Sequence, residues 1–399
     1  MKLLFVADGR SPIALNWIRH FAETGHEVHL ASLFPCQPDL ELASLTILPV
    51  AFSGAVKSGS GGSAAGLKAR ILRAAATPRL RTWLRHTFVP RSLPQAAERL
   101  TALAAALKPD LVHAMRVPYE GMLAAFAAQG GGLQAPLLIS IWGNDFTLHA
   151  PASRALTRLT RAAMQQADAL HTDCYRDQHL AQDWGFDSAK PAAVLPGGGG
   201  IQLDVFYPPQ SQPSADESPP TVINPRGLRA YVRNDTFFRA IPRVLARHPQ
   251  TRFVCPNMAG HPEAERWVRD LDIGQAVALL PRQSRAEMAA RFREAQVVVS
   301  PSTHDGTPNT LLEAMACGCF PVVGDIESLR EWISQGENGF LVNPADPDGL
   351  ADAICEGLQN PKLRTQAQKK NARLIAERAE YQKVMGEAEK FYRRLIQTG

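Results

Sequence analysis

Two acidic residues flank a predicted loop and helix start, and carboxylates in that arrangement could help to hold a ligand that carries phosphate. Residues 297–299 are typical of a buried strand; Asp305 follows them, and Glu313 lies inside the predicted helix. A helix start after a parallel strand presents free N–H groups and the positive end of the helix dipole. From Thr307 to Glu313 the helix would rise about 9 Å. An acid at each end of a phosphate cradle suits a ligand with hydroxyl groups on both sides of a diphosphate, as in a nucleotide sugar.

The limits of this helix are predicted from three residue types. Gly306 lets the backbone turn tightly and approach a ligand. We expect Thr307 to be the N-cap, with Pro308 at the first helical position and Gly318 as the stop. The alternative is that Asp305 only caps the helix and that Glu313 belongs to a solvated face.

The length and composition indicate a globular protein of two domains. The chain has 399 residues, which is more than one ordinary domain needs, and its net charge of +5 is too modest to indicate a nucleic-acid binder. Its six cysteines contain no paired C-x-x-C set, so we expect reduced thiols and no zinc site. The apolar start over residues 1–7 is too short for a signal peptide, and no run reaches the ~18 residues of a membrane span. We therefore expect a cytoplasmic protein.

The first half of the chain alternates strands and helices, which predicts a parallel sheet. The first strand–helix turn lacks the G-x-G-x-x-G fingerprint, but Gly9 and Ser11 follow the strand, where doubly wound sheets bind ligands. His113, Asp145 and the glycine run 197–200 fall at the ends of later strands, so they could converge on the same crevice, with His113 and Asp145 as candidate catalytic residues. For His113 and Asp145 the alternative is a structural role.

Residues 57–97 contain eight lysines and arginines and no acidic residue. Apolar residues such as Trp83 and Phe88 interleave with these basic ones. The combination suggests contact with an anionic membrane surface, which would make the protein peripheral at the inner face of the membrane, or with an anionic acceptor. A solvated basic face over a packed helix is the alternative. No recognised nucleic-acid module surrounds the segment.

A proline- and serine-rich segment over residues 207–220 predicts a linker. We expect an N-terminal domain over residues 1–206, a second α/β domain over 221–380, and a C-terminal helix over 381–399 that packs back on the first domain.

The first loop of the second domain carries three arginines, Arg226, Arg229 and Arg233. Guanidinium groups repel one another when they lie close together unless an anion binds between them, and paired phosphates are a suitable ligand. The alternative is that each points separately into solvent.

Residues 304–323 and 336–354 resemble the signature of retaining nucleotide-sugar glycosyltransferases of family 4, also called glycosyltransferase group 1. The usual signature is Glu-Gly-x-Pro, three residues, Leu-Glu-Ala-Met-Ala-x-Gly, a Pro-Val-Val strand and a later Gly-x-x-Gly-x-Leu-Val. Weaker likeness covers nearly the whole chain, including residues 108–113 and 200–206. The resemblance implies the α/β GT-B fold, with two Rossmann-like domains and a deep cleft between them. It also implies transfer of a sugar, with retention, from a nucleotide diphosphate to a hydroxyl of a glycan or lipid-linked acceptor.

The resemblance further implies roles for single residues. Glu313 would hold the ribose hydroxyls, Asp305 would contact the donor sugar at the reacting face, and the N–H groups of Asn309 and Thr310 would bind the distal phosphate. The same donor-binding loop contains Gly306 and Thr307. No metal or other cofactor is expected, because cationic side chains and the helix dipole stabilise the departing diphosphate.

Arg226 and Arg233 stand where the family places a phosphate-binding Arg and Lys, and Arg282 would lie by the base. Arg233 in place of Lys is one of three departures from the family pattern, and Asp305 in place of the usual Glu is another. The third is Trp142, which stands where many members have a histidine near the reacting carbon, so that Asp145 becomes the candidate there.

Two other functions fit the same residues. One is a GT-B nucleotide-sugar epimerase, and the other is a catalytically silent relative that binds a glycan or a lipid.

Overall fold

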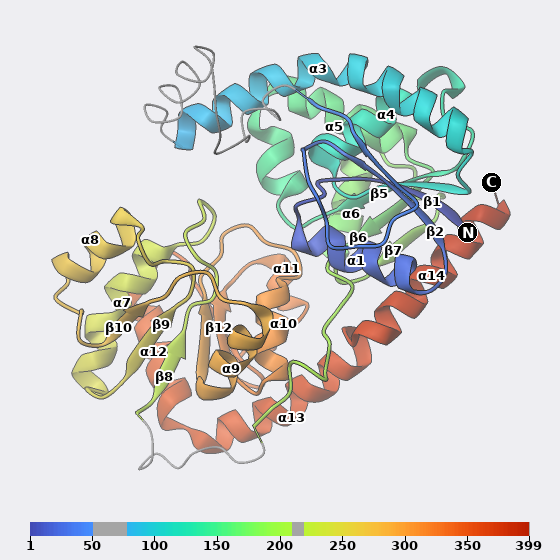
Figure 1. Ribbon diagram of the computed structural model, residues 1–399. Coiled ribbons are helices and arrows are strands. Elements are labelled where there is room, and N and C mark those ends of the chain that lie inside the picture. Colours follow the sequence, from blue (N-terminus) through green and yellow to red (C-terminus); the bar gives the residue numbers. More distant parts are fainter. Residues whose placement is uncertain (51–77, 210–218, 399) are drawn as a thin grey trace. The chain divides into compact units, whose positions relative to one another are not determined.

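The computed structural model describes residues 1–50, 78–209 and 219–398, and for residues 78–91 it describes only the helical backbone (Figure 1). The described chain forms two compact units: unit 1 is Met1–Gly198 with Met385–Gly399, and unit 2 is Gly199–Val384. The chain enters unit 2 at the glycine run, a few residues before the expected limit at 206, because the Ile201 N–H donates to the Ala379 carbonyl at 2.6 Å. Part of the basic segment 57–97, namely residues 57–77, lies outside the described residues.

Unit 1 contains a parallel sheet of seven strands in the order β3-β2-β1-β4-β5-β6-β7. The strands are β1 (Lys2–Ala7), β2 (Glu27–Ser32), β3 (Ser44–Ile47), β4 (Leu111–Ala114), β5 (Leu137–Ile141), β6 (Ala169–Thr172) and β7 (Ala192–Val194). The helices are α1 (Pro12–Glu23), α3 (Pro78–Leu107), α4 (Met122–Ala128), α5 (Arg154–Gln166), α6 (Tyr175–Asp183) and most of α14 (Tyr381–Thr398), whose first four residues belong to unit 2. Short helical turns are η2 (Val117–Gly121), η3 (Gln129–Gly131), η4 (Asp145–His149) and η5 (Ala150–Ala152).

The two faces of this sheet are covered differently, because successive side chains of a strand point to opposite faces. Leu4, Val112 and Ile139 belong to an apolar core with the helices α3, α4 and α5 (Figure 1). Phe5 and His113 face the other way, toward aromatic residues of α1 and α14. The second face is therefore partly polar and is closed by the C-terminal helix, as expected.

Unit 2 contains a parallel sheet of six strands in the order β10-β9-β8-β11-β12-β13. The strands are β8 (Thr221–Ile223), β9 (Arg252–Cys255), β10 (Val277–Leu279), β11 (Val297–Ser300), β12 (Phe320–Gly324) and β13 (Phe340–Val342). The helices are α7 (Asn234–Arg247), α8 (Pro262–Asp270), α9 (Arg285–Glu294), α10 (Asn309–Ala316), α11 (Glu327–Arg330), α12 (Pro347–Gln359) and α13 (Pro361–Arg378).

Each sheet begins at an interior strand, adds two strands on one side, and then reverses to add strands on the other side. The reversal lies between β1 and β4 in unit 1 and between β8 and β11 in unit 2. Doubly wound sheets bind ligands at the carboxyl ends of the strands that flank such a reversal. The prediction of two Rossmann-like α/β domains is confirmed, and the reversals indicate where to look for a site. No helix among the described residues is both long and apolar enough to cross a membrane.

Candidate functional site

The arginine-rich loop and the predicted phosphate loop of unit 2 meet at the reversal of its sheet. Arg226 follows β8 and Asp305 follows β11, and these two strands pair directly. The Thr303 N–H donates to the Tyr231 carbonyl at 2.8 Å, which joins the two loops through their backbones. The structure therefore brings together two segments that are about 80 residues apart in the sequence.

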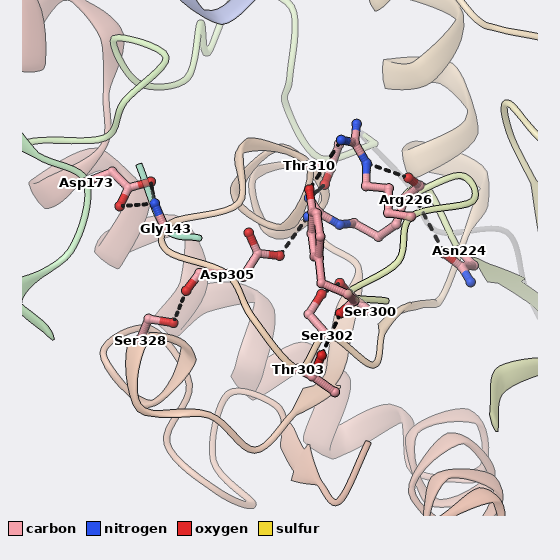
Figure 2. A network of polar contacts seen from close by, with 12 residues as sticks. Gly143, Asp173, Asn224, Arg226, Ser300, Ser302, Thr303, Asp305, Thr310 and Ser328 are labelled. Carbon is pink, nitrogen blue, oxygen red and sulfur yellow. Dashed lines mark hydrogen bonds and ion pairs between the residues drawn. The ribbon is translucent and has the colours of Figure 1, made fainter. Parts of the chain in front are cut away.

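Arg226 is the centre of this site, as Figure 2 shows. Its Nη2 lies 2.6 Å from Oδ2 of Asp305, and its Nη1 donates to Oγ1 of Thr310 at 3.1 Å. The Arg226 side chain is 8% exposed and that of Asp305 is 13% exposed. The buried Nε of Arg226 has no hydrogen-bond partner among the described residues. A buried donor without a partner is costly, and an anionic oxygen would satisfy it.

The helix α10 begins one residue later than predicted. Pro308 is its N-cap, because the Oγ1 of Thr307 instead accepts a hydrogen bond from Nε1 of Trp332 at 3.0 Å. The prediction that Thr307 caps the helix is therefore wrong, although Thr307 and Gly306 both lie buried in the loop before it. Gly318 follows the helix with φ 89°, a backbone conformation that favours glycine.

The first turn of α10 and the side chain of Glu313 provide hydrogen-bonding groups for a ligand. The N–H groups of Asn309 and Thr310 begin the helix, so they have no partner within it. Glu313 is half-buried, and no hydrogen bond or ion pair to its carboxyl occurs within the described chain. Burial raises its pKa to about 7, and Arg285 opposes this shift. A carboxyl in this setting is ready to accept hydrogen bonds from a ligand.

The other predicted donor-binding arginines are placed differently. Arg233 forms two 2.8 Å contacts with the carboxylate of Asp235, and its hydrogen bonds are the main cause that lowers the Asp235 pKa to about 2. Arg229 is exposed, and its Nε donates to the Arg226 carbonyl at 3.0 Å. Arg282 is exposed between β10 and α9, and no hydrogen bond or ion pair of the described chain joins it to Arg226.

In unit 1 the loop after β1 is held by its own contacts. The Gly9 N–H donates to Ser32 Oγ at 3.1 Å, and a Cβ on Gly9 would overlap the sulfur of Cys36. Ser11 caps α1 by accepting a hydrogen bond from the Ala14 N–H. Both residues thus have local structural roles, and donor binding by either one stays a prediction.

His113 lies within β4 and is only 1% exposed, so its side chain points into a face of the sheet and not to the carboxyl edge. Its Nε2 lies 2.7 Å from Ser140 Oγ, and its Nδ1 contacts the Tyr392 hydroxyl. One orientation of the protons satisfies a continuous chain of donors that runs from Trp17 through Tyr392, His113, Ser140 and His171 to the Leu195 carbonyl. Burial, reinforced by His171, holds the pKa of His113 well below its usual range. The geometry makes His113 a neutral member of a buried network and lends no support to its predicted catalytic role.

Asp145 is buried, and both of its carboxylate oxygens are engaged. Oδ1 accepts from Nε of Arg116 at 2.8 Å, and Oδ2 accepts from the Trp142 N–H at 3.0 Å. The Asp145 side chain is 0% exposed, whereas that of Arg116 is 31% exposed. Arg116 also has φ 145°, which is strained for any residue other than glycine. At this edge the structure thus presents a guanidinium in place of the expected carboxylate.

Sequence reasoning missed Arg116 and a second titratable group nearby, Glu120. Glu120 is 5% exposed, and burial is the main cause that raises its pKa to about 7, with Asp8 adding to the shift and Arg116 opposing it. Each follows β4 within a few residues, and that position is the signal that could have identified them. Trp142 lies against Gly197, where a Cβ would be 3.2 Å from its Nε1.

A group of possible metal ligands lies after β6, where the ligand atoms of Asp173, Cys174 and Asp177 are within 4.8 Å of one another. The Arg176 guanidinium already lies 2.8 Å from Asp177, and the Asp173 carboxylate accepts from the Gly143 N–H at 3.3 Å (Figure 2). Burial also raises the pKa of the Cys174 thiol far above its usual range, which disfavours a thiolate ligand. The chemistry of this group therefore fits a structural cluster better than a metal site.

Comparisons with known proteins agree with this architecture. Residues 9–198 match the family model described as "Glycosyl transferase 4-like domain", and residues 223–360 match that described as "Glycosyl transferases group 1". A D-inositol 3-phosphate glycosyltransferase of Corynebacterium jeikeium (strain K411) is 31% identical over 134 residues, which cover 32% of this chain and 32% of that protein. The chain spans between 22% and 54% of the length of such curated relatives.

Two solved structures share the fold over their whole length. Sucrose-phosphate synthase from Thermosynechococcus elongatus has a TM-score of 0.76 at 17% identity, with 100% of both chains covered. HepE of Anabaena in complex with UDP has a TM-score of 0.72 at 13% identity, with 98% of this chain and 99% of that chain covered. The predicted GT-B architecture is confirmed, and since the two family models between them match parts of both units, the chain belongs to the glycosyl transferases of group 1.

Proposed function

We propose that the protein is a retaining glycosyltransferase that moves a sugar from a nucleoside-diphosphate sugar to a hydroxyl of a glycan or lipid-linked acceptor. The observation that carries the proposal is Arg226, held between Asp305 and Thr310 at the start of α10 with its Nε lacking a partner among the described residues. A guanidinium beside a helix N-terminus is suited to a diphosphate. Glu313, one turn further along the helix, is suited to the hydroxyls of the attached ribose.

Relatives support the same class of donor. The solved structures of HepE include complexes with UDP and with UDP-glucose, and several curated relatives are named D-inositol 3-phosphate glycosyltransferases. A donor of this class places negative charge on a leaving diphosphate, which a helix N-terminus and an arginine stabilise.

In the proposed reaction, the bond between the anomeric carbon and the diphosphate oxygen breaks, and the acceptor oxygen bonds to that carbon on the same face. The electron pair of the broken bond stays on the diphosphate, and the acceptor proton passes to its departing oxygen. Arg226 and the first N–H groups of α10 stabilise the charge that develops on the diphosphate. This arrangement asks for no divalent metal.

Substitution of Glu313 by Ala tests the proposal most directly. We expect nucleoside-diphosphate release from a panel of nucleotide sugars to fall by about 10²-fold or more, because the ribose hydroxyls lose the carboxylate that accepts their hydrogen bonds. Thermal unfolding of the variant should stay cooperative. Asp352→Asn, on α12 and outside the site, is a matched control. Turnover of Glu313→Ala near that of the control would refute the assignment.

The same assay separates the alternatives. Release of an epimerised sugar without an acceptor would indicate an epimerase, and absence of both turnover and slow donor hydrolysis would indicate a silent binding protein.

A further inference from the structure

We propose that Asp305 is the counter-ion of Arg226 and sets how tightly the leaving nucleoside diphosphate is held, in place of the donor-sugar contact that the family resemblance implies. The inference rests on the proposed function, because it concerns the same donor site.

The pair is buried and closely spaced. Oδ2 of Asp305 lies 2.6 Å from Nη2 of Arg226, and the two side chains are 13% and 8% exposed. Charges screened this little by water interact several times more strongly than a surface pair does. An Asp305 oxygen that is committed to Arg226 accepts a donor hydroxyl less readily.

Both partners are fixed from their own backbones. The Asp305 carbonyl accepts from Ser328 Oγ at 2.7 Å, which ties the loop after β11 to α11 (Figure 2). The Arg226 N–H donates to Oδ1 of Asn224 at 3.2 Å, and the Arg226 carbonyl accepts from Arg229. These contacts hold the two loops that carry the ion pair, and the hydrogen bond from Nη1 of Arg226 to Thr310 also orients the guanidinium.

This arrangement changes how a diphosphate would bind. A phosphate that binds Arg226 has to share the guanidinium with the Asp305 carboxylate, which is already in contact with it. The net charge of the pair that the phosphate meets is therefore near zero, whereas that of an unpaired arginine is +1. Arg233 is likewise paired with a carboxylate, that of Asp235. A donor site whose arginines carry their own counter-ions binds the diphosphate product less tightly, which favours product release.

Calorimetric titration of UDP, GDP, ADP and inorganic pyrophosphate tests the inference. Asp305→Asn keeps the size of the side chain and an oxygen that Arg226 can donate to, but it removes the charge. We expect Asp305→Asn to bind pyrophosphate, and whichever nucleoside diphosphate the wild type binds, about tenfold more tightly or better. Asp352→Asn also removes one acidic charge of unit 2 from an arginine pair, and it should bind as the wild type does. If Asp305 contacts the donor sugar instead, pyrophosphate and nucleoside diphosphates, which carry no sugar at that position, should bind Asp305→Asn with the wild-type affinity.

Two further variants test the same inference if Asp305→Asn does not fold. Asp305→Ser removes the charge with a smaller side chain and should also tighten binding, whereas Asp305→Glu keeps the charge and should stay within about threefold of the wild type. Unchanged or weaker binding in both neutral variants would overturn the counter-ion role and leave the proposed function standing. Absence of binding of all four probes, both to the wild type and to the two neutral variants, would overturn the proposed function itself.

Discussion

The carboxyl edges of the two sheets follow the same strand order but differ in how their polar groups are used. In unit 1, both nitrogens of His113 and both carboxylate oxygens of Asp145 are engaged by neighbouring residues. In unit 2, the Arg226 Nε and the Glu313 carboxyl have no partner within the described chain. Other buried polar atoms of the described chain also lack a hydrogen-bond partner, among them Nε1 of Trp142 in unit 1, so the contrast concerns the ionisable groups of the two edges. A buried ionisable group without a partner is costly, and a ligand that pairs with it would remove that cost.

Strand order locates the edge of each sheet, whereas the ionisable groups that lack a partner at that edge indicate what it can bind. Arg116 and Arg226 illustrate this, because each follows the strand that borders a reversal and each pairs with an aspartate. Arg116 pairs with the wholly buried carboxylate of Asp145. Arg226, in contrast, has an Nε without a hydrogen-bond partner in the described chain and lies beside the start of α10. We therefore infer that the first pair mainly holds a turn and that the second mainly holds an anion.

Breaking these two arginine pairs one at a time should have the strongest consequences. Arg226→Ala should weaken nucleoside-diphosphate binding by about 10²-fold or more, since it removes the central cation of the site. Arg116→Ala should leave that affinity nearly unchanged, but it should cost about 3 kcal/mol of stability, because Asp145 would remain as a buried, uncompensated charge. Calorimetry and chemical denaturation on both variants make the test. Equal losses of affinity would erase the distinction between the two edges.

His113 tests whether unit 1 contributes structure or chemistry. His113→Gln should lower the free energy of unfolding by about 2–4 kcal/mol, because the Tyr392 hydroxyl and Ser140 lose partners in a dry interior. We expect kcat of the folded variant to stay within about threefold of the wild type. Tyr392→Phe breaks the same network from α14 and should behave alike. A loss of kcat above about 10²-fold in His113→Gln, with Tyr392→Phe fully active, would return His113 to the catalytic residues.

Much of the fold could be predicted from periodicity alone. The strand predicted at residues 297–299 is present as β11, because three successive valines suit a strand that is buried on both faces. The strand β3 was missed because it has only four residues, too short a run for its alternation of polar and apolar residues to stand out. The limits of α10 were displaced because the tertiary partner of Thr307, Trp332, competes for the hydroxyl that would have capped the helix.

The site could be predicted only in part, for a related reason. A residue's type and its distance from a strand indicate that it can reach a sheet edge, which was enough for Arg226, Asp305 and Glu313. The sequence could not indicate that His113 points into the face of its sheet, because a shift of one position along a strand reverses the side-chain direction. Arg116 was missed because its role depends on a contact with Asp145, 29 residues away.

The smallest expected effect separates the two carboxyl groups whose pKa is raised to about 7, Glu313 in unit 2 and Glu120 in unit 1. Ribose hydroxyls donate to the ionised form of Glu313, so nucleoside-diphosphate affinity should fall about tenfold as the pH drops from 8 to 6. The terminal phosphate titrates near the same range, and the quantity to measure is therefore the difference between the wild type and Glu313→Gln. Calorimetry at four pH values between 6 and 8 would show it. Identical pH dependence in the two proteins would remove Glu313 from the ribose site.

Glu120→Gln is the matched control, since Glu120 lies in unit 1 near Arg116, whose guanidinium is already paired with Asp145. Its pKa is raised on folding, so protonation of Glu120 stabilises the fold below about pH 4.5, and this stabilisation is lost as the pH rises through 7. The variant should therefore be more stable than the wild type at pH 8, by up to about 3 kcal/mol, and should show the wild-type pH dependence of nucleotide binding. If Glu120→Gln instead changed that dependence as Glu313→Gln does, the edge of unit 1 would share in donor binding, and the contrast between the two edges would not hold.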